Sequence, residues 1–487
     1  MTAVRHELRF LLRHTAVYGL GMMLSRFVAF LLLPLYTRYL TPTDYGILEL
    51  IGATSSLVGL ILGFGVAHAL TRFYYELPEP ERPRLVATAY ALAAGAATIG
   101  ALSCMPASPW LAAVVLDGPQ YARHFQIGFA SLLVGLFSDI GMAYLRLLYR
   151  STAAIAVALA SLVLTVSLNV FLIVWLQLGV LGVLTGNLIA QTAVALPLTA
   201  AVLSGTGFRP KASIARAVVA YTAPLVPSGL MTMGAAQADR YFLRYFVSIA
   251  DTGLFGLASK LSGSIHLFVT STFMLTFMPR RFEIADQPDA RRVLARIFDF
   301  HFAAFLLPAM LMAMFVREVL LLMTTPAFYP SGNLVPILLL QALAVSSKYH
   351  FEFGIMHTKQ TKYYVYANAV SGAVHVVLGF ILVRTYSIWG AAFAGLASSA
   401  LYGLLLHLAA RRLYYIPFAF GRNALALSIA AAAVGLAWLV PADNLVLDVT
   451  LKALLAAGAG LLFLWVYRIQ PASLLRMAVP GPSPAAP

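Results

Sequence analysis

The sequence predicts an all-α membrane protein with roughly fourteen transmembrane helices, each about 20 residues long. Of its 487 residues, 61% are hydrophobic and only 10% are charged, and the mean hydropathy is +0.85. A chain with so few polar side chains cannot cover the surface of a soluble globule. The alternating pattern of a membrane β-barrel is absent, so the spans are expected to be helices.

The predicted spans follow one another along the whole chain, each bounded by charges, prolines or polar turns. We place them at about 14–36, 45–70, 85–106, 125–147, 152–176, 179–203, 217–241, 251–279, 294–316, 333–356, 362–384, 388–410, 424–441 and 448–467. Lysine and arginine collect on the cytoplasmic side of membrane proteins. With a cytoplasmic N-terminus, inner segments hold 23 of the 33 lysine and arginine residues and outer segments hold 7. We therefore expect both termini in the cytoplasm.

Two pairs of segments indicate an internal duplication. Residues 38–48 resemble 244–255, and residues 168–182 resemble 374–390, at sequence offsets between 206 and 208. Two independent matches at nearly one spacing favour a repeated architecture, which is common in transporters. We accordingly expect an N-terminal lobe over 1–210, a C-terminal lobe over 211–415, two additional helices over 416–470 and a short disordered tail over 471–487.

Ionisable side chains within the spans are the candidate functional residues, because charge in the hydrocarbon region is costly. Arg26 lies near the middle of the first span, where it either lines an aqueous cavity or forms a structural ion pair. Lys260 either faces a cavity or extends toward the outer interface. Lys348 and Glu352 stand at positions i and i+4, so the two can instead neutralise each other along one helix face.

Among the other acids in predicted spans, Glu49 and Asp139 are further candidates. Each can pair with an arginine or accept a proton, and Asp139 is two turns before Arg146 on the same helix face. Glu49, Asp139 and Glu352 are therefore candidate coupling acids. We expect the membrane potential to drive transport without these acids, because it favours outward movement of a negatively charged cargo, and proton uptake by one of the acids is the alternative.

Several kinds of chemistry lack a signature in this sequence. Cys104 is the only cysteine, and no histidine and carboxylate set has metal-ligand spacing, so neither a metal nor another cofactor is expected. No phosphate-binding glycine loop or serine nucleophile motif is present, and we expect no enzymatic activity. The net charge of +15 is spread over short loops, which indicates membrane topology rather than nucleic-acid binding.

Three sequence regions carry a family resemblance. They read LPLYTRYLTPTDYGILELI at 33–51, APLVPSGLM with ADRYFLRYFVSIADTGLFGLASKL within 223–261, and TKQTKYYVYANAV with YSIWGAAFAG within 358–395. They resemble the bacterial polysaccharide biosynthesis family of lipid-linked oligosaccharide flippases. The superfamily also contains multidrug and toxin extruders and peptidoglycan-precursor flippases. One departure is His375, where family members often carry asparagine.

The resemblance implies two pseudosymmetric six-helix bundles around a central cavity, with two further C-terminal helices. It also implies an undecaprenyl-diphosphate-linked oligosaccharide as cargo, carried across the inner membrane for a surface polysaccharide such as O-antigen, capsule or exopolysaccharide. Arg26, Lys260 and Lys348 match the cationic cavity residues of such flippases. A polysaccharide polymerase and the chain-length machinery are the expected partners. Tyrosines that could contact the sugars are Tyr144, Tyr221, Tyr349 and Tyr364.

Two other functions are open to this sequence. A multidrug extruder of the same fold would use carboxylates to bind an organic cation, and the acids named above keep that function open. A membrane glycosyltransferase or polysaccharide polymerase would need a sizeable outer loop, and no such loop is evident between the predicted spans.

Overall fold

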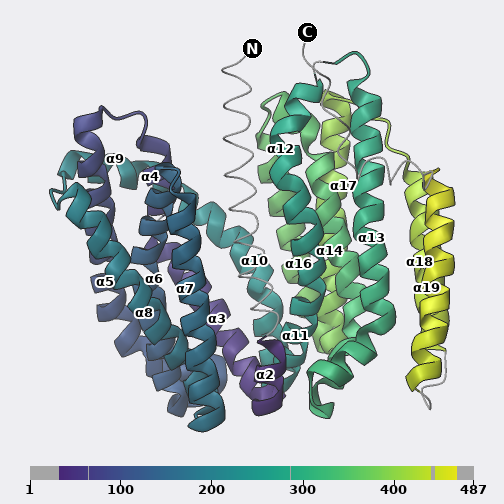
Figure 1. The fold of residues 1–487 in the computed structure, drawn as a ribbon, viewed down its shortest axis with the longest axis horizontal. Coiled ribbons are helices and arrows are strands. Elements are labelled where there is room, and N and C mark those ends of the chain that lie inside the picture. The colour runs from purple at the N-terminus through teal and green to yellow at the C-terminus, as the bar shows by residue number, and fades with distance from the viewer. Residues whose placement is uncertain (1–31, 64, 286, 440–444, 469–487) are drawn as a thin grey trace. The chain divides into compact units, whose positions relative to one another are not determined.

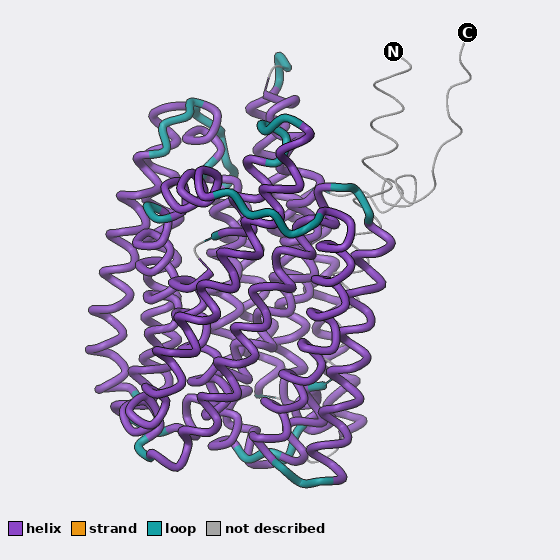
Figure 2. Tube along the Cα trace, turned by 90° about the vertical axis from the view of Figure 1, so that its left-hand side faces the viewer, coloured by secondary structure: helices purple, strands orange, loops and turns teal. Residues whose placement is uncertain are grey.

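The described part of the chain consists of helices and loops. The computed structural model describes residues 32–63, 65–285, 287–439 and 445–468, and these contain no strand (Figure 2). Twelve of their helices are long and apolar enough to cross a membrane, and a bent pair brings the number to 13. The predicted first span, 14–36, lies mostly outside the described residues. The all-helical, multi-span prediction is confirmed.

The first half of the described chain forms a series of helices that are labelled in Figure 1. They are α2 (Leu33–Tyr39), α3 (Pro42–Gly63), α4 (Val66–Phe73), α5 (Arg82–Leu116), α6 (Ala122–Leu147), α7 (Ser151–Val170) and α8 (Gly179–Thr206). The predicted second span, 45–70, is interrupted between α3 and α4. Gly65 there has a positive φ of 61°, a left-handed conformation that glycine adopts without steric cost.

The second half of the described chain continues in the same way. Its helices are α9 (Ala212–Thr222), α10 (Leu225–Phe246), α11 (Ile249–Ile265), α12 (Thr272–Ala285), α13 (Ala290–Met323), α14 (Val335–Phe351), α15 (Phe353–His357), α16 (Lys362–Tyr386), α17 (Ile388–Leu413), α18 (Phe420–Trp438) and α19 (Leu445–Tyr467). A π-helical turn, His266–Ser271, joins α11 to α12 without a loop. Helices α9 and α10 meet at an angle of 44° next to Pro224, which caps the start of the second.

Residue contacts divide the chain into two compact units. Unit 1 comprises Met1–Leu257, Met323–Phe328 and Gly372–Ala394, and unit 2 comprises Ala258–Leu322, Tyr329–Ser371 and Gly395–Pro487. Helices α11, α16 and α17 therefore contribute to both units. The lobe boundaries at 210 and 415 stay a prediction.

The start of α3 and the start of α11 share one capping arrangement. The Thr41 hydroxyl donates to the Asp44 carboxylate at 2.8 Å and accepts from the Asp44 N–H at 3.2 Å. At the equivalent positions of the second repeat, the Ser248 hydroxyl donates to Asp251 at 2.6 Å and accepts from its N–H at 3.0 Å. Both pairs satisfy amides that the helix start leaves without partners.

The same two helices cross through a reciprocal glycine contact within unit 1. A Cβ built on Gly46 would overlap the carbonyl oxygen of Ile249, and one built on Gly253 would overlap that of Pro42. The sequence offset from Pro42 to Ile249 equals the offset from Gly46 to Gly253. The contact therefore maps onto itself when the repeats are exchanged, which supports the duplication inferred from sequence.

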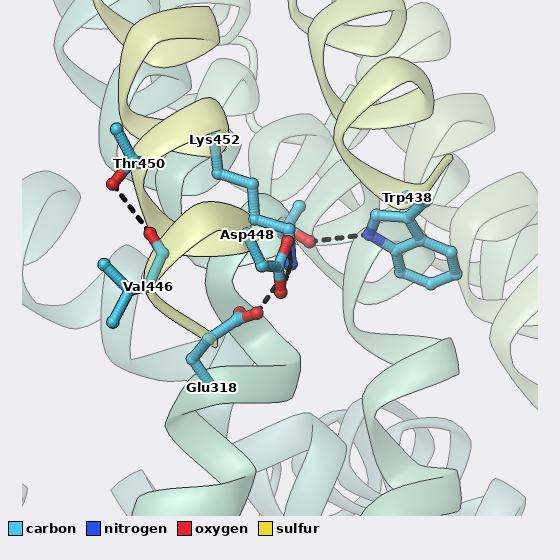
Figure 3. A network of polar contacts seen from close by, with 7 residues as sticks. Glu318, Trp438, Val446, Asp448, Thr450 and Lys452 are labelled. Carbon is cyan, nitrogen blue, oxygen red and sulfur yellow. Dashed lines mark hydrogen bonds and ion pairs between the residues drawn. The ribbon is translucent and has the colours of Figure 1, made fainter. Parts of the chain in front are cut away.

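Helices α18 and α19 lie side by side (Figure 1), and two polar networks connect them to α13 within unit 2. In the first, Asp299 of α13 accepts from Arg422 at 2.9 Å and from Asn423 at 3.0 Å. In the second, shown in Figure 3, Lys452 of α19 donates to Glu318 of α13 at 2.6 Å and to Asp448 at 3.1 Å. Breaking a buried pair by removing one partner is strongly destabilising, so these networks fix the last two helices to α13.

Candidate functional site

The site that the sequence predicts at Lys348 lies near the end of α14 in unit 2. The Lys348 ammonium stands over the rings of Tyr349 and Tyr402, at 5.1 Å and 5.5 Å from their centroids. Both distances fall within the range of an attractive cation–π contact. Tyrosine rings lower the cost of a buried charge without cancelling it, so this cation can still attract an anion.

Glu352 forms an ion pair with an arginine of α12. Its carboxylate lies 3.6 Å from Arg281 Nη2, and the two side chains are 9% and 0% exposed. Arg281 also donates to the Tyr349 carbonyl oxygen at 2.8 Å and stands over the rings of Phe282 and Phe353. Arg281 is therefore a partner of Glu352 besides Lys348, whose charge also acts on this carboxylate. Neutralisation of Lys348 by Glu352 along the helix stays a prediction.

Arg281 is a member of this cluster that the sequence prediction missed, because it falls in a predicted inner segment outside the spans. In the structure α12 continues to Ala285, and Arg281 is the largest fully buried side chain among the described residues. Its sequence neighbours include Pro279, Arg280 and Glu283, which are typical of the end of a span, so the sequence carries no signal that Arg281 is buried.

A group of tyrosines surrounds this charge cluster. Tyr364 of α16 and Lys348 are electrostatic neighbours of Glu352, and Tyr402 of α17 interacts with Tyr349 and Glu352. We call Lys348, Arg281, Glu352, Tyr349, Tyr364 and Tyr402 together the Lys348 site. Two of the tyrosines predicted to contact sugars, Tyr349 and Tyr364, belong to it. The other two lie in unit 1, where Tyr144 packs against Tyr74 and Tyr221 against Phe73.

Lys260 is exposed on α11 and lies at a different level from Lys348. The hydroxyl of Ser262 bonds the Val335 carbonyl at 3.3 Å, and that of Thr270 bonds Ser346 at 2.6 Å. These contacts show that the segment 249–285 and α14 run in the same direction. Lys260 precedes the first contact and Lys348 follows the second, so the two cations are roughly 18 to 23 Å apart along the helix direction at about 1.5 Å per residue.

The remaining predicted site residues belong to the first half of the chain. Glu49 of α3 lies 3.4 Å from Arg240 of α10, an ion pair whose side chains are 11% and 19% exposed. Asp139 is exposed on α6, where Arg146 and His68 are charged neighbours. Arg26 lies outside the described residues. The described residues bring together no three His, Cys, Asp or Glu side chains able to hold a metal ion.

Two buried histidine contacts were not predicted. His301 and His350 approach to 3.0 Å through Nδ1 and Nε2 in unit 2. In unit 1, His375 Nε2 of α16 lies 3.2 Å from Asp239 Oδ1 of α10. The sequence distinguishes His375 as a departure from the family pattern, but it assigns no partner, because Asp239 lies on a helix far away in the chain.

Comparison with solved structures shows that the chain shares its fold with known membrane proteins. The chain is similar to the lipid II flippase MurJ in an inward closed conformation, with a TM-score of 0.74 and 13% identity, covering 93% of this chain and 99% of that chain. It is also similar to an inward-facing multidrug resistance MATE family transporter of the MOP superfamily, with a TM-score of 0.63, 14% identity, and coverage of 82% and 94%. A MOP superfamily transporter from Pyrococcus furiosus gives a TM-score of 0.52 at 14% identity, with coverage of 83% and 95%.

The chain thus has the fold that the MurJ flippase and MATE family structures share. The model of the polysaccharide biosynthesis protein family matches residues 11–285, more than half of the chain. The chain belongs to this family. None of the curated protein sequences matches it.

Proposed function

We propose that this protein is a flippase that moves an undecaprenyl-diphosphate-linked oligosaccharide from the cytoplasmic to the outer leaflet of the bacterial inner membrane. The cargo would serve a surface polysaccharide, and a polymerase with its chain-length machinery would receive it. Family membership and the flippase fold support transport without catalysis. The two repeats would alternate access between the leaflets.

The Lys348 site is the observation that carries this proposal. A diphosphate needs cationic partners, and oligosaccharides bind against aromatic rings. The site offers an ammonium within cation–π range of Tyr349 and Tyr402, and a second cation, Arg281, pairs with the nearby Glu352, so the two cations outnumber the one acid. Hydrogen bonds to charged groups contribute about 1.5 to 3 kcal/mol each, which is enough to select an anionic head group.

The separation of the two lysines supports a path with two binding positions. With both termini in the cytoplasm, Lys348 lies in the inner half of its span and Lys260 in the outer half of its own. The diphosphate would bind first near Lys348 and reach Lys260 during outward opening. Arg26, the third predicted cation, would act from the first repeat.

A cation extruder is the second candidate, and the acids of this protein argue against it. Glu49 and Glu352, two of the three candidate carboxylates, lie 3.4 Å and 3.6 Å from an arginine. An organic cation would have to displace those guanidinium groups. Asp139 is exposed, so it is the candidate acid through which an organic cation could bind and through which this alternative can be tested.

The test is export of the lipid-linked oligosaccharide by variants of Lys348. Lys348→Ala should reduce flipping in reconstituted vesicles about tenfold or more, since losing one charge-assisted contact of about 1.5 to 3 kcal/mol corresponds to that factor. Lys348→Arg should retain most activity. Lys362→Ala, which removes an exposed lysine at the start of α16, is the matched control. Normal flipping by Lys348→Ala at normal abundance would contradict the proposal.

Topology is tested separately with reporter fusions. Fusions at Arg150 and Arg292 should report the cytoplasm, and fusions near Asp117 and Asp443 the periplasm. A C-terminal reporter on the periplasmic side would contradict the even number of spans and reverse the assignment of inner and outer positions to Lys348 and Lys260.

A further inference from the structure

The contact between His375 and Asp239 places two titratable side chains inside unit 1. The two residues are 6% and 4% exposed, and the distance between Nε2 and Oδ1 is 3.2 Å. His375 stands near the middle of α16, which runs from Lys362 to Tyr386 and matches a predicted span. Ionisable groups at this depth are rare and mark functional sites, including proton relays.

The surroundings of this pair are apolar and closely packed. A Cβ on Gly379 would lie 3.0 Å from the Phe242 ring and 3.9 Å from Asp239 Oδ1, so this glycine lets α16 approach α10. Phe242 packs edge-on against Phe380 with centroids 6.2 Å apart. Helix α17 contributes the backbone carbonyl of Ala394, which accepts a hydrogen bond from the imidazole. Little water reaches the two side chains.

Besides Asp239, helix α10 carries Arg240 and Arg244, and α16 carries Lys362 and Arg384 near its two ends. Arg244 lies 3.0 Å from Asp117, and Arg384 stands over the Phe246 ring at 5.8 Å from its centroid. Arg240 is directed at Glu49 of α3, at 3.4 Å, so that pair is neutral as a whole. The His375 and Asp239 pair has a net charge of −1 when the imidazole is neutral and of zero when it holds a proton. Burying an uncompensated charge costs several kcal/mol, which favours the protonated pair while the site is closed. Opening to water removes that preference.

The first repeat carries no equivalent titratable pair at its described positions. His375 corresponds to Asn169 at an offset of 206, and Asn169 donates to the Tyr36 hydroxyl at 2.7 Å. Asp239 and Phe242 correspond to Leu33 and Tyr36. Helix α7 is thus joined to α2 by a neutral hydrogen bond, whereas α16 is joined to α10 by an acid and a base. A purely structural link between these helices does not require ionisable groups.

We propose that His375 and Asp239 form a proton-binding site that couples transport to the pH gradient. A proton passes from water to the imidazole when the site is open on one side and returns to water when it is open on the other. The pair binds one proton and releases one proton in each transport cycle, and no other bond is made or broken. The coupling rests on the proposed flippase function, but the proton site does not.

Proton binding is tested without any cargo. Protein labelled with nitrogen-15 histidine is reconstituted in bilayers, and solid-state NMR follows the imidazole signals from about pH 5 to about pH 8. The His375 signal, identified by its loss in His375→Asn, should show imidazolium at the acidic end. In Asp239→Asn it should stay neutral throughout. A neutral His375 at every pH in the wild type, or a signal unchanged by Asp239→Asn, would overturn the proposal.

Coupling is tested in vesicles loaded with an undecaprenyl-diphosphate-linked oligosaccharide. An imposed pH gradient should accelerate wild-type flipping, whereas Asp239→Asn should flip at the same rate with and without the gradient. Loss of the gradient response in Asp139→Asn but not in Asp239→Asn would overturn the coupling. If the wild type flips no cargo while the NMR titration succeeds, the flippase function is wrong and the proton site stands.

Discussion

Equivalent positions of the two repeats differ where α7 meets α2 and where α16 meets α10. Asn169 and Tyr36 form a neutral hydrogen bond at 2.7 Å, and His375 and Asp239 form an ionisable contact at 3.2 Å. By contrast, the reciprocal glycines Gly46 and Gly253 are the same in both repeats. The duplicated chain keeps the contacts that set helix geometry, whereas the polar partners have diverged.

The largest expected effect is the loss of stability when a buried ion pair is broken. The pair in unit 2, Arg281 with Glu352, is more deeply buried than the pair in unit 1, Arg240 with Glu49. Arg281→Met should lower the free energy of unfolding by about 3 to 5 kcal/mol, because it leaves Glu352 buried without its guanidinium partner. Arg240→Met should cost less, since Glu49 and Arg240 are 11% and 19% exposed and solvent can compensate. Unfolding in detergent, followed by the melting temperature, measures both.

Glu352→Gln added to Arg281→Met should recover part of the loss, because the unpaired charge is then removed. If Arg281→Met and Arg240→Met lower the melting temperature equally, the exposure of an ion pair does not determine how much it contributes to stability here.

A smaller effect is expected at the glycine crossing, and here the repeats should behave alike. Gly46→Ala and Gly253→Ala each place a methyl group on a backbone oxygen that cannot move aside, and overpacking of this kind costs about 1 to 3 kcal/mol or more. The melting temperatures of the two variants should fall by similar amounts. Gly52→Ala is the control, since nothing lies within 4 Å of the place that its added methyl group would occupy. A large difference between Gly46→Ala and Gly253→Ala would argue against a reciprocal crossing.

The smallest effect on stability is expected when residues of the second repeat are replaced by their equivalents from the first. The triple change Asp239→Leu, Phe242→Tyr and His375→Asn supplies the residues found at 33, 36 and 169. Replacing a buried ion pair is often neutral for stability, and the new hydrogen bond contributes about 0.6 kcal/mol. The melting temperature should therefore stay close to that of the wild type. Reverting Tyr to Phe at position 242 should lower it slightly, and a collapse of the triple variant would mean that the pair has a structural role.

The sequence was sufficient to predict the helices, because a membrane span is recognised from a continuous apolar stretch of about 20 residues. It also located Lys348 and the repeat positions of Asn169 and His375. It did not identify the partners of Glu352 or His375, which are supplied by helices distant in the chain, α12 and α10. Such pairings depend on how the helices pack and rotate. Arg281 is an example, because the sequence analysis counts it as a cation of an inner segment, whereas in the structure it is a fully buried helix residue.

The networks that hold α18 and α19 have a consequence for biogenesis. Helix α13 emerges from the ribosome well before α18 and α19, so Glu318 and Asp299 enter the membrane before their partners exist. Lys452 inserts with Asp448 already beside it, one turn earlier in the same helix. The final hairpin therefore completes the charge pairing of α13, and a chain truncated before α18 would leave two acids of that helix without their cations.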